Sequence, residues 1–153
     1  TAIVSGKNGT AGVGLVEVYD LDAGADARLV NLSTRGFVQT GSDVMIGGFI
    51  LGNSNESARI VLRAIGPSLA QAGISGALAD PTLQLVNGNG DAVAFNNNWR
   101  DTQQAELQAT TIPPSNELES AVVATIPPGA YTAVVAGNGG QTGVALVELY
   151  HLQ

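Results

Sequence analysis

Short runs of alternating hydrophobic and polar residues follow one another along this chain, with turn-forming residues between them. β-Branched residues and alanine supply most of the apolar positions, while glycine, proline and asparagine gather between the runs. This spacing predicts an all-β fold, an antiparallel β-sandwich of jelly-roll-like form. The predicted strands are 1–5, 12–21, 28–32, 36–39, 44–51, 58–65, 81–86, 91–95, 119–126, 129–137 and 143–152.

Two short segments carry helix signals instead. Residues 68–72 begin at a serine that can act as an N-cap and end at Gly73. A second helix is predicted from Asp101, as the N-cap, to Ala109, because a proline pair follows soon after it. The sandwich is therefore expected to carry one or two short helices.

Glycines mark two special places in the strand pattern. The sequence Asn-Gly-Asn-Gly at 87–90 separates two alternating runs and is the strongest hairpin signal in the chain. Gly47 and Gly48 interrupt the apolar run 44–51, which predicts either a β-bulge or a close approach of another backbone.

The N-terminal residues repeat the sequence of the last two predicted strands. Residues 1–22 align without a gap on residues 132–153, at an offset of 131, and 12 of the 22 aligned positions are identical. Self-similarity of this kind is the mark of repeated modules. A short polar break at 22–26 follows the first copy. We therefore expect one β-sandwich module at 23–153, preceded at 1–22 by the closing hairpin of a preceding or neighbouring copy.

Composition narrows the range of partners. Six basic and thirteen acidic residues give a net charge of −7, which disfavours nucleic acid and anionic membranes as partners. The chain has no cysteine, so thiol nucleophiles, thiolate metal sites and disulfides are excluded. No apolar run approaches the ~18 residues that a membrane-spanning helix needs. If the protein is secreted, its signal peptide lies outside this chain.

Several sequence strings carry a resemblance to known modules. They are Asp80-Pro81-x-Leu-x-Leu, Asn98-Trp99-Arg100, Glu119-Ser120, Pro128-Gly129-Ala-Tyr131-Thr-Ala, and the segments 27–36 and 62–69. With these strings the chain resembles modules that are repeated in tandem in very long secreted proteins of environmental bacteria, and residues 80–149 are more distantly similar to the bacterial pre-peptidase C-terminal β-sandwich. The resemblance implies an extracellular or cell-surface module without catalytic activity, and it carries over no catalytic residue.

Residues suited to catalysis are few. The only histidine, His151, has Asp20 as its counterpart in the first copy, which indicates a solvent-facing strand end rather than a general base. Glu117 and Glu119 are two residues apart, as a pair of acids in glycoside hydrolysis can be, but they follow two prolines and are expected in a solvated loop. We therefore expect no enzymatic activity and no catalytic residues.

Two polar clusters suggest ligands. Asn87, Asn89 and Asp91 imitate the start of a calcium loop, although the glutamate that completes such a loop is absent. A plain hairpin turn is the alternative, and no cofactor other than calcium is suggested. Trp99, beside Asn96, Asn97 and Asn98, could form a stacking platform for a glycan or could anchor one end of the sandwich.

Charged residues inside apolar strands predict an ion pair. Glu148 lies in the apolar strand 143–152, and Glu17 holds the same place in the first copy. Arg63 interrupts the apolar strand 58–65. Because an unpaired charge in such a setting costs several kcal/mol, we expect Glu148 to pair with Arg63 or Arg35 and so fix the strand register.

The repeated strand pair suggests how copies associate. Exposed strands offer unpaired backbone groups to neighbouring chains. We therefore expect a structural module of an extracellular bacterial assembly, a filament subunit or stalk repeat, joined head to tail to copies of itself through residues 1–22. The alternative is a carbohydrate- or calcium-binding accessory module of a secreted protein.

Overall fold

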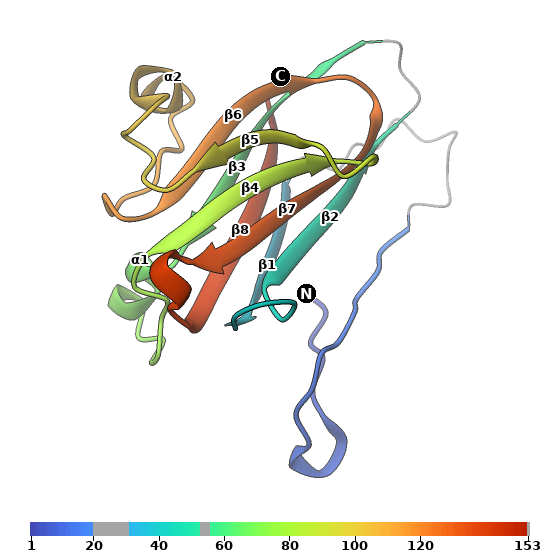
Figure 1. Cartoon of the computed structure of the whole chain (residues 1–153), viewed down its shortest axis with the longest axis vertical. Helices are drawn as coiled ribbons and strands as arrows, with labels where there is room; N and C mark the ends of the chain where they lie inside the picture. The colour runs from blue at the N-terminus through green and yellow to red at the C-terminus, as the bar shows by residue number, and fades with distance from the viewer. Residues whose placement is uncertain (20–30, 53–55, 153) are drawn as a thin grey trace.

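The computed structural model describes residues 1–19, 31–52 and 56–152, in which two four-stranded antiparallel sheets pack face to face (Figure 1). The strand order is β1-β8-β3-β6 in the first sheet and β2-β7-β4-β5 in the second. The predicted antiparallel β-sandwich is thus confirmed. Its strands are β1 (Asn31–Val38), β2 (Met45–Leu51), β3 (Ala58–Ile65), β4 (Pro81–Asn87), β5 (Ala92–Asn96), β6 (Ser120–Ile126), β7 (Gly129–Gly137) and β8 (Gly143–Leu152).

Two short α-helices lie beside the sheets, as predicted, but both begin at other residues. α1 (Pro67–Gln71) has Gly66 as its N-cap, because the fixed φ of Pro67 suits the first helical position. α2 (Gln104–Ala109) has Gln103 as its N-cap. The predicted caps Ser68 and Asp101 are therefore wrong. No helix in the described part of the chain is long and apolar enough to cross a membrane.

Apolar side chains form two separate clusters. The larger cluster fills the space between the sheets and includes Leu62, Leu83 and Val135. The smaller one covers the outer face of the first sheet, where Leu107 of α2 packs with Val61 of β3. Because Leu62 and Val61 of β3 belong to different clusters, this strand is apolar on both faces at its centre, and the uninterrupted apolar run 60–62 follows from that position.

The structure tests the two predictions made from glycines in the strand pattern. The hairpin turn at 87–90 joins β4 to β5 as expected. Gly47 lies in continuous register opposite Ala133, so there is no bulge at this point. A Cβ atom on Gly47 would lie 3.1 Å from a methyl of the Val147 side chain, and its nearest neighbours are all side-chain atoms, so the alternative prediction of a close backbone approach is also wrong. The two strands expected at 28–32 and 36–39 are a single strand, β1, within the described residues.

The last two strands do not form a hairpin. β7 lies between β2 and β4 in one sheet, and β8 lies between β1 and β3 in the other. The 3-10 turn η2 (Asn138–Gly140) carries the chain from one sheet to the other. This arrangement is a β-arch, and we call residues 129–152 the closing arch. It supplies a central strand to each sheet, so both sheets depend on it.

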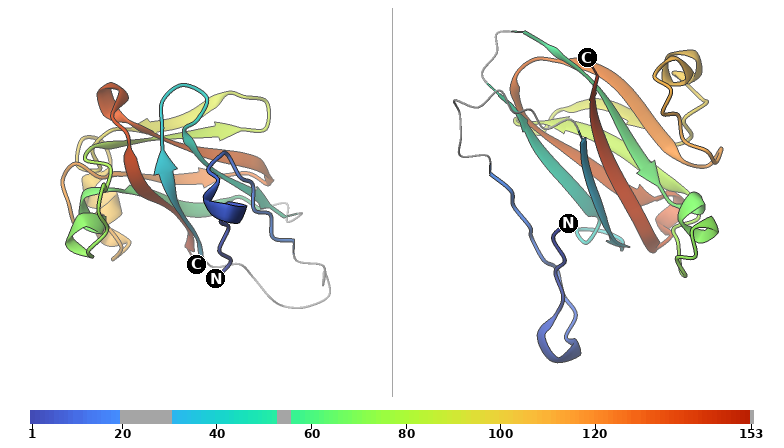
Figure 2. Two further views of the ribbon diagram at one scale, coloured as in Figure 1. Left: turned by 90° about the horizontal axis from the view of Figure 1, so that it is seen from below. Right: turned by 180° about the vertical axis from the view of Figure 1, so that it is seen from behind.

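The N-terminal segment, residues 1–19, projects away from the sandwich (Figures 1 and 2). It contains the 3-10 turn η1 (Lys7–Gly9) and no strand, so the strands predicted at 1–5 and 12–19 are not formed. The matching strands of the closing arch pair with four other strands and not with each other, which explains why an isolated copy has no ladder. Residues 20–22, 28–30 and the predicted boundary at 22–26 lie outside the described residues.

Candidate functional site

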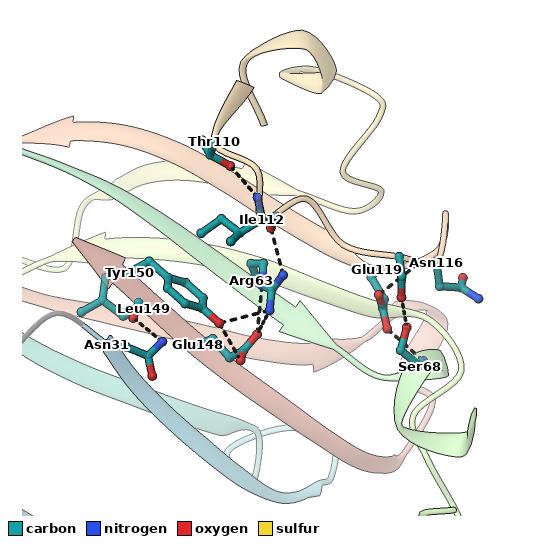
Figure 3. A network of polar contacts seen from close by, with 11 residues as sticks. Asn31, Arg63, Ser68, Thr110, Ile112, Asn116, Glu119, Glu148, Leu149 and Tyr150 are labelled. Atoms are coloured by element: carbon teal, nitrogen blue, oxygen red, sulfur yellow. Dashed lines mark hydrogen bonds and ion pairs between the residues drawn. The ribbon is translucent and has the colours of Figure 1, made fainter. Parts of the chain in front are cut away.

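Arg63 and Glu148 form an ion pair on the outer face of the first sheet (Figure 3). They are direct partners in the β3–β8 register. The Arg63 guanidinium donates two hydrogen bonds to Glu148 Oε2, the one from Nε at 2.9 Å, and its Nη1 donates to the carbonyl of Ile112 at 2.9 Å. Both side chains are largely buried. The structure thus brings together two residues that the sequence placed 85 positions apart.

Tyr150 completes this network from β8. Its hydroxyl donates to Glu148 Oε1 at 3.0 Å and accepts from Arg63 Nη2 at 3.2 Å. The Arg63 guanidinium also lies 5.1 Å from the centre of the Tyr150 ring, within cation–π range. Burial raises the pKa of the Tyr150 hydroxyl, an effect that Arg63 opposes and Glu148 reinforces. We call these three residues the Arg63 network.

Arg35, the other predicted partner of Glu148, lies elsewhere. It is exposed on β1, opposite Leu146 rather than Glu148. No ion pair in the described part of the chain joins Arg35 to Glu148. The prediction of Arg35 is corrected by the register, which places Ser33 opposite Glu148.

Glu119 is fully buried, contrary to the expected solvated loop. Its two carboxylate oxygens accept hydrogen bonds from the backbone N–H groups of Ser68, at 2.9 Å, and Asn116, at 3.2 Å. Glu119 therefore ties the start of α1 to the loop before β6 (Figure 3). Glu117 is exposed, as predicted for this loop, and pairs with Arg100 at 2.7 Å.

A hollow of about 190 Å³ lies between Glu119 and the Arg63 network. It is lined by both carboxylates, by Arg63, and by the hydroxyl-bearing residues Ser68 and Ser115. The two serine hydroxyls are 2.7 Å apart and bond to each other. Each of these polar side chains has a hydrogen-bond partner within the protein: Arg63 and Glu148 bond to each other, and Glu119 accepts from backbone amides.

Trp99 is a structural anchor. Its side chain is only 3% exposed, packs in the smaller apolar cluster, and donates from Nε1 to the Asn116 carbonyl at 3.1 Å. The guanidinium of Arg100 lies over the ring, 4.9 Å from its centre. A glycan cannot stack on a ring that is covered in this way, so the predicted platform is corrected in favour of the anchor.

The asparagines beside Trp99 are mostly engaged within the protein. Asn96 is buried, donates to the Asn98 carbonyl at 2.9 Å and accepts from the Ala121 amide at 3.0 Å. Asn98 donates to Asp101 at 3.3 Å. The side-chain oxygens of Asn97 and Asn98 are buried and receive no hydrogen bond from the described residues. Ligand binding by this cluster stays a prediction that rests on those two oxygens.

The residues of the predicted calcium loop are used in the β4–β5 turn. The side-chain oxygen of Asn87 accepts from the amides of Asn89 and Asp91, both at 2.9 Å. The Asn87 side-chain amide donates to the carboxylate of Asp91 at 3.1 Å. This is the bonding of an Asx-type turn, which uses the oxygen that a cation would need.

His151 lies on β8, half-buried, opposite Ile60.

The N-terminal segment repeats the turn of the closing arch in backbone geometry. Asn8 in η1 has φ 56° and ψ 33°, and its counterpart Gly139 in η2 has φ 63° and ψ 20°. In each turn the amide of the capping residue, Thr10 or Gln141, donates to a carbonyl three residues earlier at 3.3 Å. The left-handed conformation is readily adopted by glycine and by asparagine, so either residue can make this turn.

The same segment repeats part of the Arg63 network. The hydroxyl of Tyr19 donates to Glu17 Oε1 at 3.0 Å, as Tyr150 donates to Glu148 Oε1 at 3.0 Å. This hydrogen bond raises the pKa of Tyr19. No ion pair joins Glu17 to an arginine in the described residues. The segment thus holds two of the three residues of the network.

Apolar side chains of the N-terminal segment are left in solvent. Val16 is 52% exposed whereas its counterpart Val147 is 5% exposed, and Val4 is 64% exposed whereas Val135 is fully buried. Every one of residues 1–19 is exposed. The large apolar side chains involved are Ile3, Val4, Val13, Leu15, Val16, Val18 and Tyr19.

Sequence reasoning missed two residues of the polar sites. Tyr150 lies two residues from Glu148 and therefore on the same face of its strand, a signal that was available. The burial of Glu119 had no such signal, because it depends on Ser68 of α1, which lies 51 positions away.

Comparisons with known proteins give only a distant likeness. No family model matches the chain, and no curated protein matches it. One solved structure, the pre-peptidase C-terminal domain of a collagenase from Bacillus anthracis, is similar over 80% of this chain and 90% of that chain. The sequence identity is 15% and the TM-score is 0.45.

Proposed function

We propose that this protein is a non-enzymatic structural module of an extracellular bacterial assembly, a filament subunit or stalk repeat joined head to tail by β-strand contacts. The observation that carries the proposal is the N-terminal segment, which exposes seven large apolar side chains and forms no strand within residues 1–19. Large apolar side chains that are exposed in such number within one short segment favour an interaction site.

The chemistry of the segment suits strand addition. Its backbone is extended on both sides of η1, so N–H and C=O groups are free to pair with a sheet. Its apolar side chains gain roughly 1.5–3 kcal/mol each when they are fully buried. Docking on another copy joins two different surfaces, the segment of one chain and the body of the next. Such a heterologous contact extends into a fibre unless its rotation closes a ring.

The sandwich body fits a mechanical rather than a catalytic role. Arg63, Glu148 and Glu119 are all bonded within the protein, and each links segments that are far apart in sequence. These bonds hold β3, β8 and the loop before β6 together within and beside the first sheet. Localisation outside the cell is part of the proposal, and it rests on the resemblance of strings such as Asn98-Trp99-Arg100 to modules of secreted bacterial proteins.

The test is assembly of the unmodified chain against a matched pair of variants. Light scattering after size exclusion and electron microscopy should show oligomers or filaments for the full chain and monomers for a chain without residues 1–22. Val16→Asp should also give monomers, because its counterpart in the arch is buried. Ala11→Asp adds the same charge where the counterpart, Thr142, is exposed, and should still assemble. A monomeric full chain, or assembly that tolerates Val16→Asp, would refute the proposal.

A further inference from the structure

We infer that the free edges of β1 and β2 form the surface on which the N-terminal segment of another copy docks, with one arm of the segment along each edge and Glu17 beside Arg35. This inference rests on the proposed function and names the surface that receives the segment. It follows from the state of the four sheet edges, from the form of the segment, and from the charges that the two surfaces carry.

β1 and β2 leave one side of the sandwich open. Each is the outermost strand of its sheet, and the two strands lie next to each other at one border of the molecule (Figures 1 and 2). Within the described part of the chain, no hydrogen bond reaches their backbones beyond the pairing with β8 and β7. Neither strand contains proline, and their only charged residue is Arg35. Edges without such protection readily pair with a further strand.

The two edges on the opposite side are protected. Side chains bond the backbone of β6: Asn96 accepts from the Ala121 amide at 3.0 Å, and Gln103 accepts from the Val123 amide at 3.0 Å and donates to its carbonyl at 2.8 Å. β5 has only five residues, and its pairing with β4 shifts register partway along. Short and irregular edge strands resist further pairing. The side formed by β1 and β2 is therefore the one suited to strand addition.

Apolar side chains are left uncovered on this side. Phe49 and Leu51 of β2 pack against the larger apolar cluster but are only partly buried. On the outer faces of the sheets, Phe37 of β1 and Ile46 and Ile50 of β2 are exposed. A strand added at each edge covers part of both sets. Removing this apolar surface from water favours docking.

The N-terminal segment has one arm for each edge. Residues 1–5 are the counterpart of part of β7, which pairs antiparallel with β2, and residues 12–19 are the counterpart of part of β8, which pairs antiparallel with β1. The turn η1 between the arms has the geometry of η2, which crosses from one sheet to the other. Because the open edges belong to different sheets, a unit with this crossing pairs with both at once. A docked segment then flanks β1 and β2 on their free side as the closing arch does on their paired side.

The side chains of the arms alternate in the way that this position requires. Val4 and Val16 are the counterparts of Val135 and Val147, which face the space between the sheets. Strand addition that keeps these faces places Val4 and Val16 beside the partly buried Phe49, where they extend the core. Their present exposure is relieved by the same contact.

Arg35 gives the open side a charge that the segment matches. The other three arginines of the described residues each form an ion pair, whereas Arg35 forms none there. Arg35 lies opposite Leu146, and therefore on the outer face that also carries Glu148. Glu17, the counterpart of Glu148, takes that face of a docked arm and is the only acidic residue among residues 1–19. The two opposite charges then lie within cross-strand reach.

The first test presents the segment as a separate peptide. A fluorescent peptide with the sequence of residues 1–22 is titrated into the full chain that carries Val16→Asp, whose own segment is not expected to dock. We expect saturable binding by fluorescence anisotropy, with NMR amide shifts centred on β1 and β2. No binding, or shifts centred on other strands, would overturn the inference. Dimers of this chain that form through the same edges without peptide would also overturn it, because the edges would then pair with each other.

Ile46 and Phe95 offer a matched pair of edge substitutions. They lie in one row across the second sheet, Ile46 on β2 and Phe95 on β5, and are 58% and 61% exposed. Ile46→Lys should weaken peptide binding by at least about tenfold, because a lysine at the open edge disfavours strand addition. Phe95→Lys should leave binding unchanged. Equal affinities of the two variants, both folded by thermal unfolding, contradict docking at β2.

A charge exchange tests the contact at β1. Arg35→Glu should weaken binding of the parent peptide by about fivefold, because two carboxylates then face each other. A peptide that carries Glu17→Arg should recover the lost affinity on the Arg35→Glu chain and bind the Arg35 chain less well. Loss of affinity without this recovery, or no loss at all, refutes the contact between Glu17 and Arg35.

Failure of this inference is distinguishable from failure of the proposed function. Assembly of the full chain that is equally strong with Ile46→Lys and with Phe95→Lys supports the proposed function and overturns the surface named here. A full chain that stays monomeric, although the peptide binds at β1 and β2, supports this surface and refutes the proposed assembly.

Discussion

Arg63 and Glu148 are direct neighbours across the β3–β8 pairing and share an ion pair on the outer face of the first sheet. A shift of β8 by one residue moves Glu148 to the other face and into the apolar core between the sheets. The pair therefore penalises the wrong register. Its exposed fractions, 17% and 11% for the two side chains, mean that solvent screens it only weakly.

This relationship predicts strong coupling between the two residues. Arg63→Met or Glu148→Gln alone should lower the free energy of unfolding by about 2–3 kcal/mol, because each leaves a buried partner unpaired. A double-mutant cycle measured by urea denaturation should give a coupling energy of about 1–3 kcal/mol. Arg35→Met serves as the control and should be nearly neutral. A coupling energy near zero would show that the pair does not fix the register.

Glu119 should be the most sensitive carboxylate in the loop before β6. Glu119→Gln replaces one acceptor oxygen by an N–H₂ group that faces a backbone N–H, so the free energy of unfolding should fall by about 2–3 kcal/mol. Glu117→Gln should change it by less than about 0.5 kcal/mol, because the ion pair with Arg100 is exposed. Equal effects of the two substitutions in urea denaturation would contradict the buried linkage described here.

Trp99 provides both a stability test and a spectroscopic probe. Trp99→Ala should cost about 3–5 kcal/mol, because it opens a cavity under α2 and leaves the Asn116 carbonyl without its donor. Phe95→Ala, at an exposed aromatic, should cost far less. Since Trp99 is the only tryptophan, its emission should be blue-shifted in the folded chain and move to longer wavelength in urea. Emission typical of exposed indole in the native chain would contradict the anchor role.

Tyr150 should make stability depend on pH in the alkaline range. The unfolded chain loses the tyrosine proton near its ordinary pKa of about 10, whereas burial raises the pKa in the folded chain. Above about pH 10 the unfolded state therefore binds fewer protons, and the free energy of unfolding falls as pH rises through the folded pKa. Below that range the hydroxyl is protonated in both states, so it does not make the free energy of unfolding depend on pH.

Urea denaturation measured from about pH 8 to about pH 11 tests the Tyr150 prediction. Tyr150→Phe should lower stability at neutral pH by about 0.5–1.5 kcal/mol through its lost hydrogen bond, and should also flatten the alkaline decline. The background titration of other tyrosines is common to both chains and cancels in the difference. An alkaline decline of equal slope in the parent and in Tyr150→Phe would assign it to other groups.

Local sequence pattern was enough for the elements but not for their partners. Alternation and turn residues gave the positions of strands such as β4 and β5, because period and turn chemistry act over a few residues. The strands that were predicted in the N-terminal segment are not formed, and the reason is related. A strand exists only when its backbone groups are paired, and the pairing of an arch comes from elements far away in sequence.

The sequence by itself determined that the opening of the chain duplicates its end and that Glu148 needs a cationic partner. Both conclusions follow from residues that are adjacent or aligned. Only the tertiary structure decided that the partner is Arg63 rather than Arg35, that Glu119 and Trp99 are buried, and that the final strands form an arch between two sheets. Those outcomes depend on register and packing between distant segments, where strand pairing and burial set the free energy, and no local pattern encodes which segments meet.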